Sequence, residues 1–276
     1  MFINDSSKII RIYSLQSNID YSRNTYLPVL YEDKYNQTKL IRNVIKVEDV
    51  FYYCKDIYTN DSWLINELIG SYLAKQLDLP SVDYQIGTYC EFRYALSKIF
   101  YDKKYSYYFP LDYKCNMNIM KSNRNSAQNN LYKDKISHLD RNVRIKLLKL
   151  IALDLKMGQY DRHEYNIMFK KDNETGEVDL AEIYDYGLSY PNHDMYDCYY
   201  NPFIELSKNS YGLGKLIKKH PEIESFIDIM KSISMEKILT DIEKEKKIEF
   251  TPQEKSSYEK LDEKYSKILE KISNRR

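Results

Sequence analysis

The stretch from Lys156 to Pro191 reads KMGQYDRHEYNIMFKKDNETGEVDLAEIYDYGLSYP, and it is the most informative part of the sequence. Gly158 predicts the end of a helix, and Asp161 lies in the charged loop DRH that follows. Asn166 opens the first of two short predicted strands, and Asp185 comes directly after the second. A hairpin brings the start of one strand beside the end of the next. We therefore expect Asp161, Asn166 and Asp185 to lie together at one end of a two-stranded ribbon.

These three polar side chains are of the kinds that phosphoryl transfer from ATP requires. Asp161 would orient the acceptor hydroxyl and take up its proton as the catalytic base. The carboxylate of Asp185 and the amide oxygen of Asn166 would hold Mg²⁺, which prefers oxygen ligands and binds through few protein groups. The spacing D-x-x-x-x-N, followed after a hairpin by D-x-G, is typical of kinases. The sequence therefore predicts a kinase whose cofactors are ATP and Mg²⁺.

The order of the loop residues, with Asp before Arg and His, is more specific. Residues 158–166, GQYDRHEYN, resemble the G-N-x-D-R-H-x-x-N loop of the HipA-like serine/threonine kinases, with Gln159 in place of the usual Asn. These bacterial kinases include persistence toxins and a shorter, proinflammatory effector subgroup. Residues 184–187, YDYG, resemble the metal-binding Y-D motif of the same family. The family's small N-terminal subdomain has no clear counterpart, which favours the shorter subgroup.

Further parts of the family pattern come in the expected order. Lys55, at the end of the aromatic run FYYCK, takes the place of the family's nucleotide lysine. Glu67 takes the place of its glutamate partner, beside Asn66 on the first helix. The resemblance therefore implies that Lys55 contacts the phosphates of ATP and that Glu67 orients it. We expect the two side chains to lie within salt-bridge reach, about 4 Å or less.

Two other segments complete the nucleotide site that the resemblance implies. Gln37-Thr38-Lys39 resembles the Q-x-K of the family's phosphate loop, with Lys39 as a phosphate ligand. Residues 96–100, LSKIF, resemble the hinge strand that precedes the adenine contacts. This places Lys98 and Phe100 among the expected ATP-binding residues.

Over the whole chain, the hydrophobic pattern indicates a β-rich part followed by a helical part. Residues 1–58 carry short apolar and aromatic runs broken by Asn, Asp and Ser, and residues 62–77 carry an apolar stripe at helical spacing. Other expected segments are strands at 81–89, 91–100, 166–169 and 180–184, a polar connection at 112–135, and helices at 140–157 and from 220, 234 and 251 onward. The pattern predicts an α+β fold. The resemblance refines it to a bilobal protein-kinase-like fold, with a small β-rich N-lobe, 1–100, and a mainly helical C-lobe, 101–276.

Three helix ends carry recognisable cap residues. Asp140 is suited to begin the helix that Gly158 ends. The run from Thr251 to Glu254 reads TPQE, which is a capping box with proline at the first helical position. The helix that follows has too few heptads for a free coiled coil, so we expect it to dock on the body of the protein.

The composition sets limits on function and partners. The 276 residues include 42 basic and 41 acidic side chains, and this balance gives no positive field that would attract nucleic acid. The four cysteines contain no C-x-x-C pair, so we expect reduced thiols and no zinc site. Neither a signal-peptide pattern nor an apolar run of membrane-spanning length occurs. We expect a cytoplasmic protein without nucleic-acid or membrane partners, and export without a cleaved signal stays open.

Four residues near the site are expected to have other roles. Arg162 and His163 are interpreted as structural, with Arg162 pairing with a nearby carboxylate and His163 fixing the loop. Thr38 and Ser189 are candidate acceptors for autophosphorylation, because a flexible hydroxyl near the site has a high effective concentration. The expected partners are a protein substrate with a Ser or Thr acceptor and, through the resemblance, an antitoxin or regulatory protein.

The residues leave two alternatives to a protein kinase open. A small-molecule or lipid kinase would use the same catalytic set and differ only in its acceptor pocket. Lipid kinases also carry D-R-H-x-x-N, but their last motif is D-F-G and their chains are much longer. A nucleotide-binding pseudokinase or interaction module is the second alternative. No glycine precedes Gly70, so the loop near residues 36–42 lacks the backbone freedom with which glycine-rich loops approach phosphates.

Overall fold

The computed structural model describes most of the segments that the sequence predicts to be ordered. The described residues are 2–3, 10–11, 43–47, 50–56, 61–89, 92–100, 102–108, 139–159, 162, 166–190 and 221–274. The strands are β1 (Phe2–Ile3), β2 (Ile10–Arg11), β3 (Asn43–Val47), β4 (Val50–Asp56), β5 (Tyr84–Tyr89), β6 (Phe92–Lys98), β7 (Tyr105–Tyr108), β8 (Phe169–Asp172), β9 (Val178–Leu180) and β10 (Ile248–Glu249). The helices are α2 (Asp61–Gln76), α4 (Arg141–Met157), α7 (Pro221–Ser232), α8 (Met235–Lys246) and α9 (Pro252–Asn274). The predicted polar connection at 112–135 lies outside the described residues.

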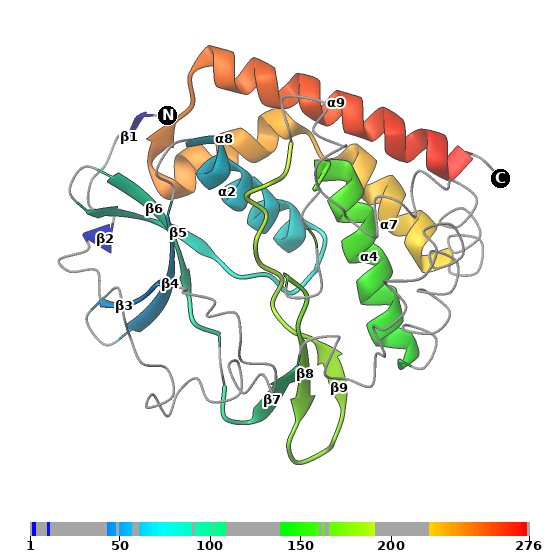
Figure 1. The fold of residues 1–276 in the computed structure, drawn as a ribbon. Coiled ribbons are helices and arrows are strands. Elements are labelled where there is room, and N and C mark those ends of the chain that lie inside the picture. Colours follow the sequence, from blue (N-terminus) through cyan, green and yellow to red (C-terminus); the bar gives the residue numbers. More distant parts are fainter. Residues whose placement is uncertain are drawn as a thin grey trace, which may run out of the picture.

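Five strands form one mixed sheet in the order β2-β5-β6-β4-β3 (Figure 1). Only β2 and β5 are parallel, and the other neighbours are antiparallel. The aromatic run FYYCK lies in β4, between β3 and β6 in the sheet. Its register places Lys55 opposite Ala95 of β6, and the pairing with β3 on the other side ends one residue earlier, at Cys54.

Residues 64–74 of helix α2 are all buried, so burial is not confined to one stripe of the helix. Its most deeply buried apolar residues are Leu64, Ile65, Leu68, Ile69 and Leu73. The polar residues Asn66 and Glu67 are buried as well. Figure 1 shows the reason, since α2 lies between the five-stranded sheet and α8 and also contacts α4. The predicted helix at 62–77 is confirmed to within one residue at each end. Its position allows it to carry polar side chains into the interior.

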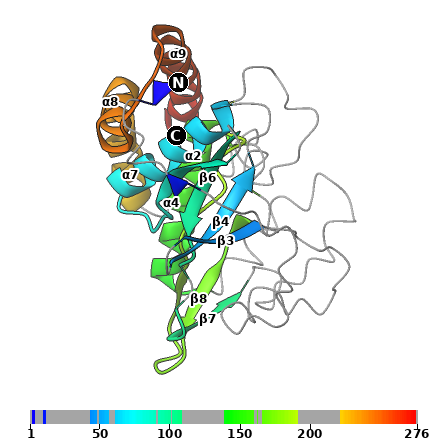
Figure 2. The same cartoon turned by 90° about the vertical axis from the view of Figure 1, so that its left-hand side faces the viewer.

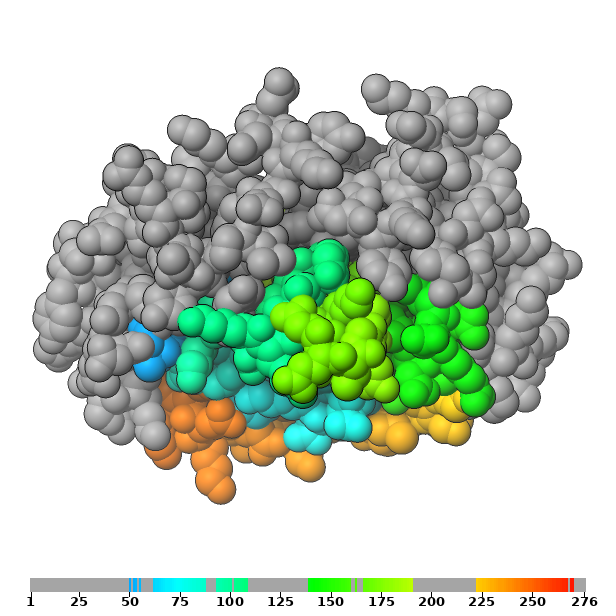
Figure 3. All heavy atoms as spheres, turned by 90° about the horizontal axis from the view of Figure 1, so that it is seen from below, coloured from blue at the N-terminus to red at the C-terminus, as the bar shows by residue number. Residues whose placement is uncertain are grey.

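The predicted hairpin is present, but its strands are displaced from the expected ranges. The expected strands at 166–169 and 180–184 are replaced by β8 and β9. The hairpin also gains a partner that the sequence did not predict, because β7 pairs with β8 to give a three-stranded antiparallel sheet. On the face drawn in Figure 3, the hairpin lies beside α4. Lys146 of α4 and Asp179 of β9 form an ion pair of 2.6 Å there.

Competing hydrogen bonds explain the displaced strand ends. The guanidinium of Arg162 donates to the backbone carbonyls of Asn166 and Tyr184, at 3.1 and 2.5 Å. The N–H of Ile183 donates to the carbonyl of Pro80 at 2.9 Å, away from the hairpin. These backbone groups therefore form hydrogen bonds outside the β8–β9 ladder, and the residues around them belong to neither strand.

The predicted helix ends are confirmed at all three positions, although the side chain of Asp140 does not cap its helix. Gly158 ends α4 in the left-handed region with φ 59°, where a Cβ would lie 2.3 Å from the ring of Tyr265. Thr251 and Glu254 form the capping box of α9, since the Glu254 N–H donates to Thr251 Oγ1 at 3.1 Å and the Thr251 N–H to Glu254 Oε2 at 2.7 Å. Asp140 precedes α4, but its side chain makes no capping hydrogen bond and only its carbonyl joins the helix.

Helix α9 packs against α4 and α8, as the sequence predicted for a docked helix. Figure 2 shows α8 and α9 together on one side of the strands. The contact with α4 includes a nearly buried ion pair between Lys156 and Asp262, with a distance of 2.9 Å. Across the described part of the chain, no helix is long and apolar enough to span a membrane.

Candidate active site

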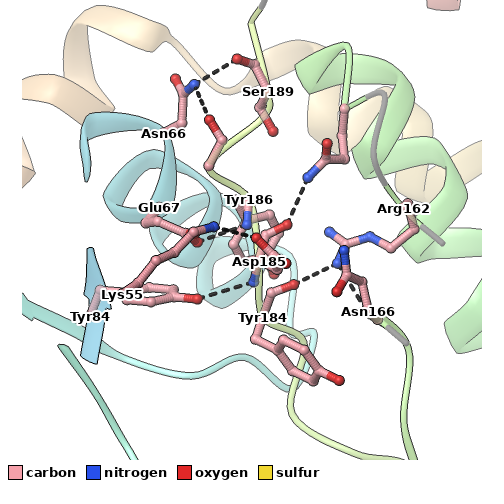
Figure 4. A network of polar contacts seen from close by, with 12 residues as sticks. Lys55, Asn66, Glu67, Tyr84, Arg162, Asn166, Tyr184, Asp185, Tyr186 and Ser189 are labelled. Carbon is pink, nitrogen blue, oxygen red and sulfur yellow. Dashed lines mark hydrogen bonds and ion pairs between the residues drawn. The ribbon is translucent and has the colours of Figure 1, made fainter. Parts of the chain in front are cut away.

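Lys55 lies between two carboxylates that come from different parts of the chain (Figure 4). Its Nζ is 2.7 Å from Oε1 of Glu67 on α2, and it also donates to Oδ1 of Asp185 after β9. The predicted contact between Lys55 and Glu67 is therefore present. Burial alone would lower the pKa of Lys55, but the charges of Glu67 and Asp185 outweigh it and hold the pKa above the usual value for lysine. Lys55 therefore carries its positive charge at neutral pH.

Glu67 joins this lysine to the backbone of the predicted metal motif. Its side chain is fully buried, and its second oxygen, Oε2, accepts the backbone N–H of Tyr186 at 2.7 Å. A buried carboxylate needs such partners to offset its lost hydration. At the next position, a Cβ on Gly187 would lie 2.8 Å from Lys55 Nζ and 3.1 Å from Glu67 Oε1. The chain therefore passes close to the ion pair because residue 187 has no side chain.

Asn66 holds the chain that follows the metal motif. Its Nδ2 donates to the carbonyls of Gly187 and Ser189, at 2.8 and 2.6 Å. Its Oδ1 accepts a hydrogen bond of 3.1 Å from the hydroxyl of Tyr258 on α9. Ser189 is only 3% exposed. The expectation that Ser189 is a flexible acceptor for autophosphorylation is corrected by this burial, because its hydroxyl is not accessible to an active site.

Arg162 ties the loop after α4 to the end of the hairpin. It is fully buried, and its guanidinium pairs with Asp154 at 3.0 Å, as expected for a structural arginine. The same guanidinium binds the carbonyls of Asn166 and Tyr184 and lies 5.2 Å from the centre of the Tyr186 ring. A buried arginine with several partners fixes its surroundings, because each lost partner would leave a desolvated charge. Asn166 is thereby held next to the segment that carries Asp185.

Asn166 and Asp185 offer the oxygen donors that Mg²⁺ prefers. The side chain of Asp185 is 26% exposed, which leaves it open to an ion, whereas Asn166 is buried. Within the described ranges, no group of three or more His, Cys, Asp or Glu side chains could hold a metal. The pair fits Mg²⁺ that is held jointly by the protein and by the phosphates of a nucleotide, a mode of binding that needs few protein ligands.

The two expected hinge residues differ in their surroundings. Lys98 ends β6, opposite Tyr52, and its side chain is exposed. Phe100 stacks on the ring of Tyr184, with 6.2 Å between the ring centres. Tyr184 directly precedes Asp185 in the chain. Phe100 therefore lies beside the candidate site, and the binding roles of both residues stay predictions.

Four predicted residues lie outside the part of the chain that the structure describes. They are Lys39, Thr38, Asp161 and His163. Their roles as phosphate ligand, autophosphorylation acceptor, catalytic base and loop-fixing residue stay predictions.

Two further side chains contact Asp185, and the sequence did not assign them to the site. Tyr84 accepts the Asp185 N–H at 3.1 Å, and Gln159 donates to the Asp185 carbonyl at 2.7 Å. Burial raises the pKa of the Tyr84 phenol well above its usual value, and the nearby carboxylates of Glu67 and Asp185 add to this rise. Gln159 stood out in the sequence only as a departure from the family loop. Tyr84 carried no signal among 29 tyrosines.

Comparison by sequence identifies no relative, since no family model and no curated protein matches the chain. Comparison by structure finds kinases. The proinflammatory kinase CtkA of Helicobacter pylori is 17% identical, with a TM-score of 0.59, over 85% of this chain and 93% of its own. HipA of Shewanella oneidensis MR-1, solved as a toxin–antitoxin complex with HipB and operator DNA, is 12% identical, with a TM-score of 0.53. The match covers 82% of this chain and 60% of HipA.

The fold is therefore a mixed α and β fold of the kind found in kinases. More particularly, it is the fold of the HipA-like kinases, which confirms the resemblance predicted from the catalytic-loop sequence. At these low identities the similarity establishes the fold and not the activity.

Proposed function

We propose that the protein transfers the terminal phosphoryl group of ATP to a Ser or Thr hydroxyl of a protein substrate. The observation that carries this proposal is the position of Lys55, whose ammonium lies between Glu67 and Asp185. A kinase uses such a lysine to bind the nucleotide phosphates and such a glutamate to orient it. The aspartate then lies close enough to take part in holding the metal that those phosphates bind.

The proposed mechanism assigns one role to each residue of the set. Lys55 contacts the α- and β-phosphates, and Glu67 keeps its ammonium in place. Asn166 and Asp185 hold Mg²⁺, which when bound neutralises the charge that develops on the transferred phosphoryl group. Asp161 orients the acceptor hydroxyl and takes up its proton. Residues 1–100 would form the lobe that covers the nucleotide, and residues 101–276 the lobe that carries these catalytic groups.

A regulatory protein is the partner that the structural neighbours favour. HipA was solved with HipB as a toxin–antitoxin system, and this chain shares its fold. The net charge of +1 favours a protein partner over direct binding of nucleic acid. We therefore propose an antitoxin or a comparable regulatory protein in addition to the substrate.

Labelling with radioactive ATP and Mg²⁺ tests the proposal most directly. Wild type, Asp161→Ala and Asp185→Ala are compared, with Asp228→Ala as the matched control because its carboxylate is 69% exposed on α7. We expect Asp161→Ala to lose transfer and keep nucleotide binding, since the base acts on the acceptor. Asp185→Ala should lose both, and Asp228→Ala should lose neither. Near wild-type turnover in both site variants would show that the assignment is wrong.

The labelling assay and a thermal-shift measurement together separate the two alternatives. Label on a small alcohol instead of on protein would indicate a small-molecule or lipid kinase. A thermal shift with nucleotide and Mg²⁺ in the absence of turnover would indicate a pseudokinase.

Mass spectrometry of the wild type tests autophosphorylation at Thr38. A phosphate there, of about −1.5 to −2 charge, would compete with ATP for Lys39 and switch the enzyme off. A modified Thr38 in a fully active enzyme would contradict that switch.

A further inference from the structure

Asp185 has a backbone conformation that its surroundings must enforce. It is not glycine, yet its φ is 66°, in the left-handed region. This region is unfavourable for residues with a side chain, although aspartate tolerates it better than most. Such conformations persist where neighbouring groups hold them, and they cluster at functional sites.

Both polar atoms of the Asp185 backbone are held by buried side chains (Figure 4). The N–H donates to the hydroxyl of Tyr84 at 3.1 Å, and the carbonyl accepts from Nε2 of Gln159 at 2.7 Å. Tyr84 is 4% exposed and Gln159 is fully buried. The two hydrogen bonds therefore hold both peptide groups next to Asp185 without competition from bulk water.

The two side chains are anchored on different rigid elements, and neither belongs to the hairpin that carries Asp185. Tyr84 begins β5, where its backbone pairs with Ser97 of β6. Gln159 follows the left-handed Gly158 at the end of α4, and its N–H donates to the carbonyl of Asp154 at 2.8 Å. The ends of β5 and α4 therefore approach Asp185 from separate parts of the fold.

We propose that Tyr84 and Gln159 are positioning residues that hold Asp185 in its left-handed conformation and thereby aim its carboxylate at Lys55 and at the metal. The inference rests on the proposed function, because it takes Asp185 to be a ligand of Mg²⁺. Residues that orient a metal ligand affect metal affinity or activity by about 10–100-fold when they are replaced. Tyr84 and Gln159 should therefore set the Mg²⁺ requirement without touching the substrate.

Two variants remove the hydrogen bonds and keep the shapes of the side chains. Tyr84→Phe deletes the hydroxyl, and Gln159→Met replaces the amide by an apolar chain of similar length. Tyr72→Phe is the matched control, because it deletes a tyrosine hydroxyl bonded to Glu245 in the contact between α2 and α8. The half-saturating Mg²⁺ concentration of ATP turnover should rise about 10–100-fold in each variant and stay at the wild-type value in the control. An unchanged Mg²⁺ requirement in both variants would overturn the proposal.

Crystal structures of both single variants and of the double variant give a readout that does not depend on activity. We expect φ of Asp185 to leave the left-handed region in the double variant and its contact with Lys55 to be lost. A left-handed Asp185 that keeps this contact in all three variants would overturn the proposal even in an active enzyme. A wild type without turnover, together with a released Asp185, would refute the proposed function and support the positioning role. If Tyr84→Phe does not fold, Gln159→Asn is used in its place, because it shortens the amide side chain by one methylene. Its Mg²⁺ requirement and its crystal structure are compared with those of the wild type, and the same outcomes support or overturn the proposal.

Discussion

Tyr258 and Asn66 are separated by 192 residues in the sequence, yet the hydroxyl of Tyr258 donates to the side-chain oxygen of Asn66 at 3.1 Å. The amide nitrogen of Asn66 donates in turn to the carbonyls of Gly187 and Ser189. The ring of Tyr258 also packs edge-on against Tyr190, with 5.8 Å between ring centres. The C-terminal helix, α2 and the segment after Asp185 are therefore connected through one buried amide, directly beside Glu67.

Tyr258→Phe should weaken this connection and keep most of the packing. The change leaves the buried oxygen of Asn66 without the Tyr258 donor, and such a loss typically costs about 1–3 kcal/mol. We expect urea unfolding to show a loss of stability in this range. We also expect lower ATP turnover, because the segment that carries Gly187 loses part of its support.

An exposed change on the same helix provides the control for this prediction. Glu263 forms an i,i+4 pair with Lys267, and both side chains are mostly exposed. Glu263→Ala should therefore change the stability by no more than about 0.5 kcal/mol. A double-mutant cycle with Asn66→Ala should give a coupling energy of about 0.5–3 kcal/mol. Additive effects of Tyr258→Phe and Asn66→Ala would contradict the connection.

Lys55→Met should weaken nucleotide binding strongly. A hydrogen bond to a charged group contributes about 1.5–3 kcal/mol, which corresponds to a loss of about 10–150-fold in affinity. The variant also leaves two carboxylates, Glu67 and Asp185, facing the site without their shared cation, and these repel the phosphates. Calorimetric titration with an ATP analogue and Mg²⁺ measures the effect.

The control for Lys55→Met is a lysine outside the site, Lys75 on α2. Lys75 pairs with Asp83 and is 44% exposed, so Lys75→Met should leave nucleotide affinity unchanged. Equal affinity in wild type and Lys55→Met would refute the role of Lys55. A nucleotide complex in which another lysine contacts the phosphates would do the same.

The parts of the site that sequence reasoning predicted correctly have local signals. The capping box of α9 is read from four consecutive residues, and the end of α4 from one glycine. The contact of Lys55 with Glu67 follows from a strand end and the helix after it, once the family pattern sets their order. Arg162 was expected to pair with a carboxylate, and its partner Asp154 lies on the helix directly before it.

The parts that were missed depend on contacts between distant segments. Tyr84 reaches Asp185 across 101 residues, and no periodic pattern marks one buried tyrosine among many. The strand ends were displaced because the Arg162 guanidinium binds carbonyls that a local pattern assigns to the hairpin ladder. The carbonyl of Ser189 accepts a hydrogen bond from Asn66, which lies 123 residues upstream on α2. Such three-dimensional competition for hydrogen bonds leaves no local trace in the sequence.

The turn that joins β8 and β9 should lose stability in acid. The carboxylate of Asp172 accepts the N–H groups of Thr175 and Glu174, at 3.0 and 2.8 Å, and lies 3.0 Å from Lys104 Nζ. These contacts, led by the Thr175 N–H, lower its pKa from 3.8 to about 2. Because the folded pKa is the lower one, the contribution to stability is fully present above the unfolded pKa of 3.8 and disappears as the pH falls through about 2.

Thermal unfolding of wild type and Asp172→Asn from about pH 5 downward tests this linkage. The difference in melting temperature should be largest above the unfolded pKa and should shrink as the pH approaches 2. Asp228→Asn, an exposed change on α7, should show no such trend. A constant difference between wild type and Asp172→Asn would show that this carboxylate keeps its ordinary pKa in the folded protein.

Gly187→Ala should separate damage to the site from damage to the fold. A methyl group at this position would lie 2.8 Å from Lys55 Nζ and 3.1 Å from Glu67 Oε1, and the nearer atom ends the Lys55 side chain, which is 33% exposed and can shift. Since Gly187 does not need a left-handed φ, the backbone accepts alanine, and the strain falls on the ion pair. We expect a melting temperature close to that of the wild type together with weaker nucleotide binding. Gly70→Ala is the contrasting variant, because its methyl would lie 2.2 Å from the packed ring of Tyr186, and such overpacking costs about 1–3 kcal/mol or more. Unchanged nucleotide affinity in a stable Gly187→Ala protein would show that the position of Lys55 against Glu67 does not limit binding.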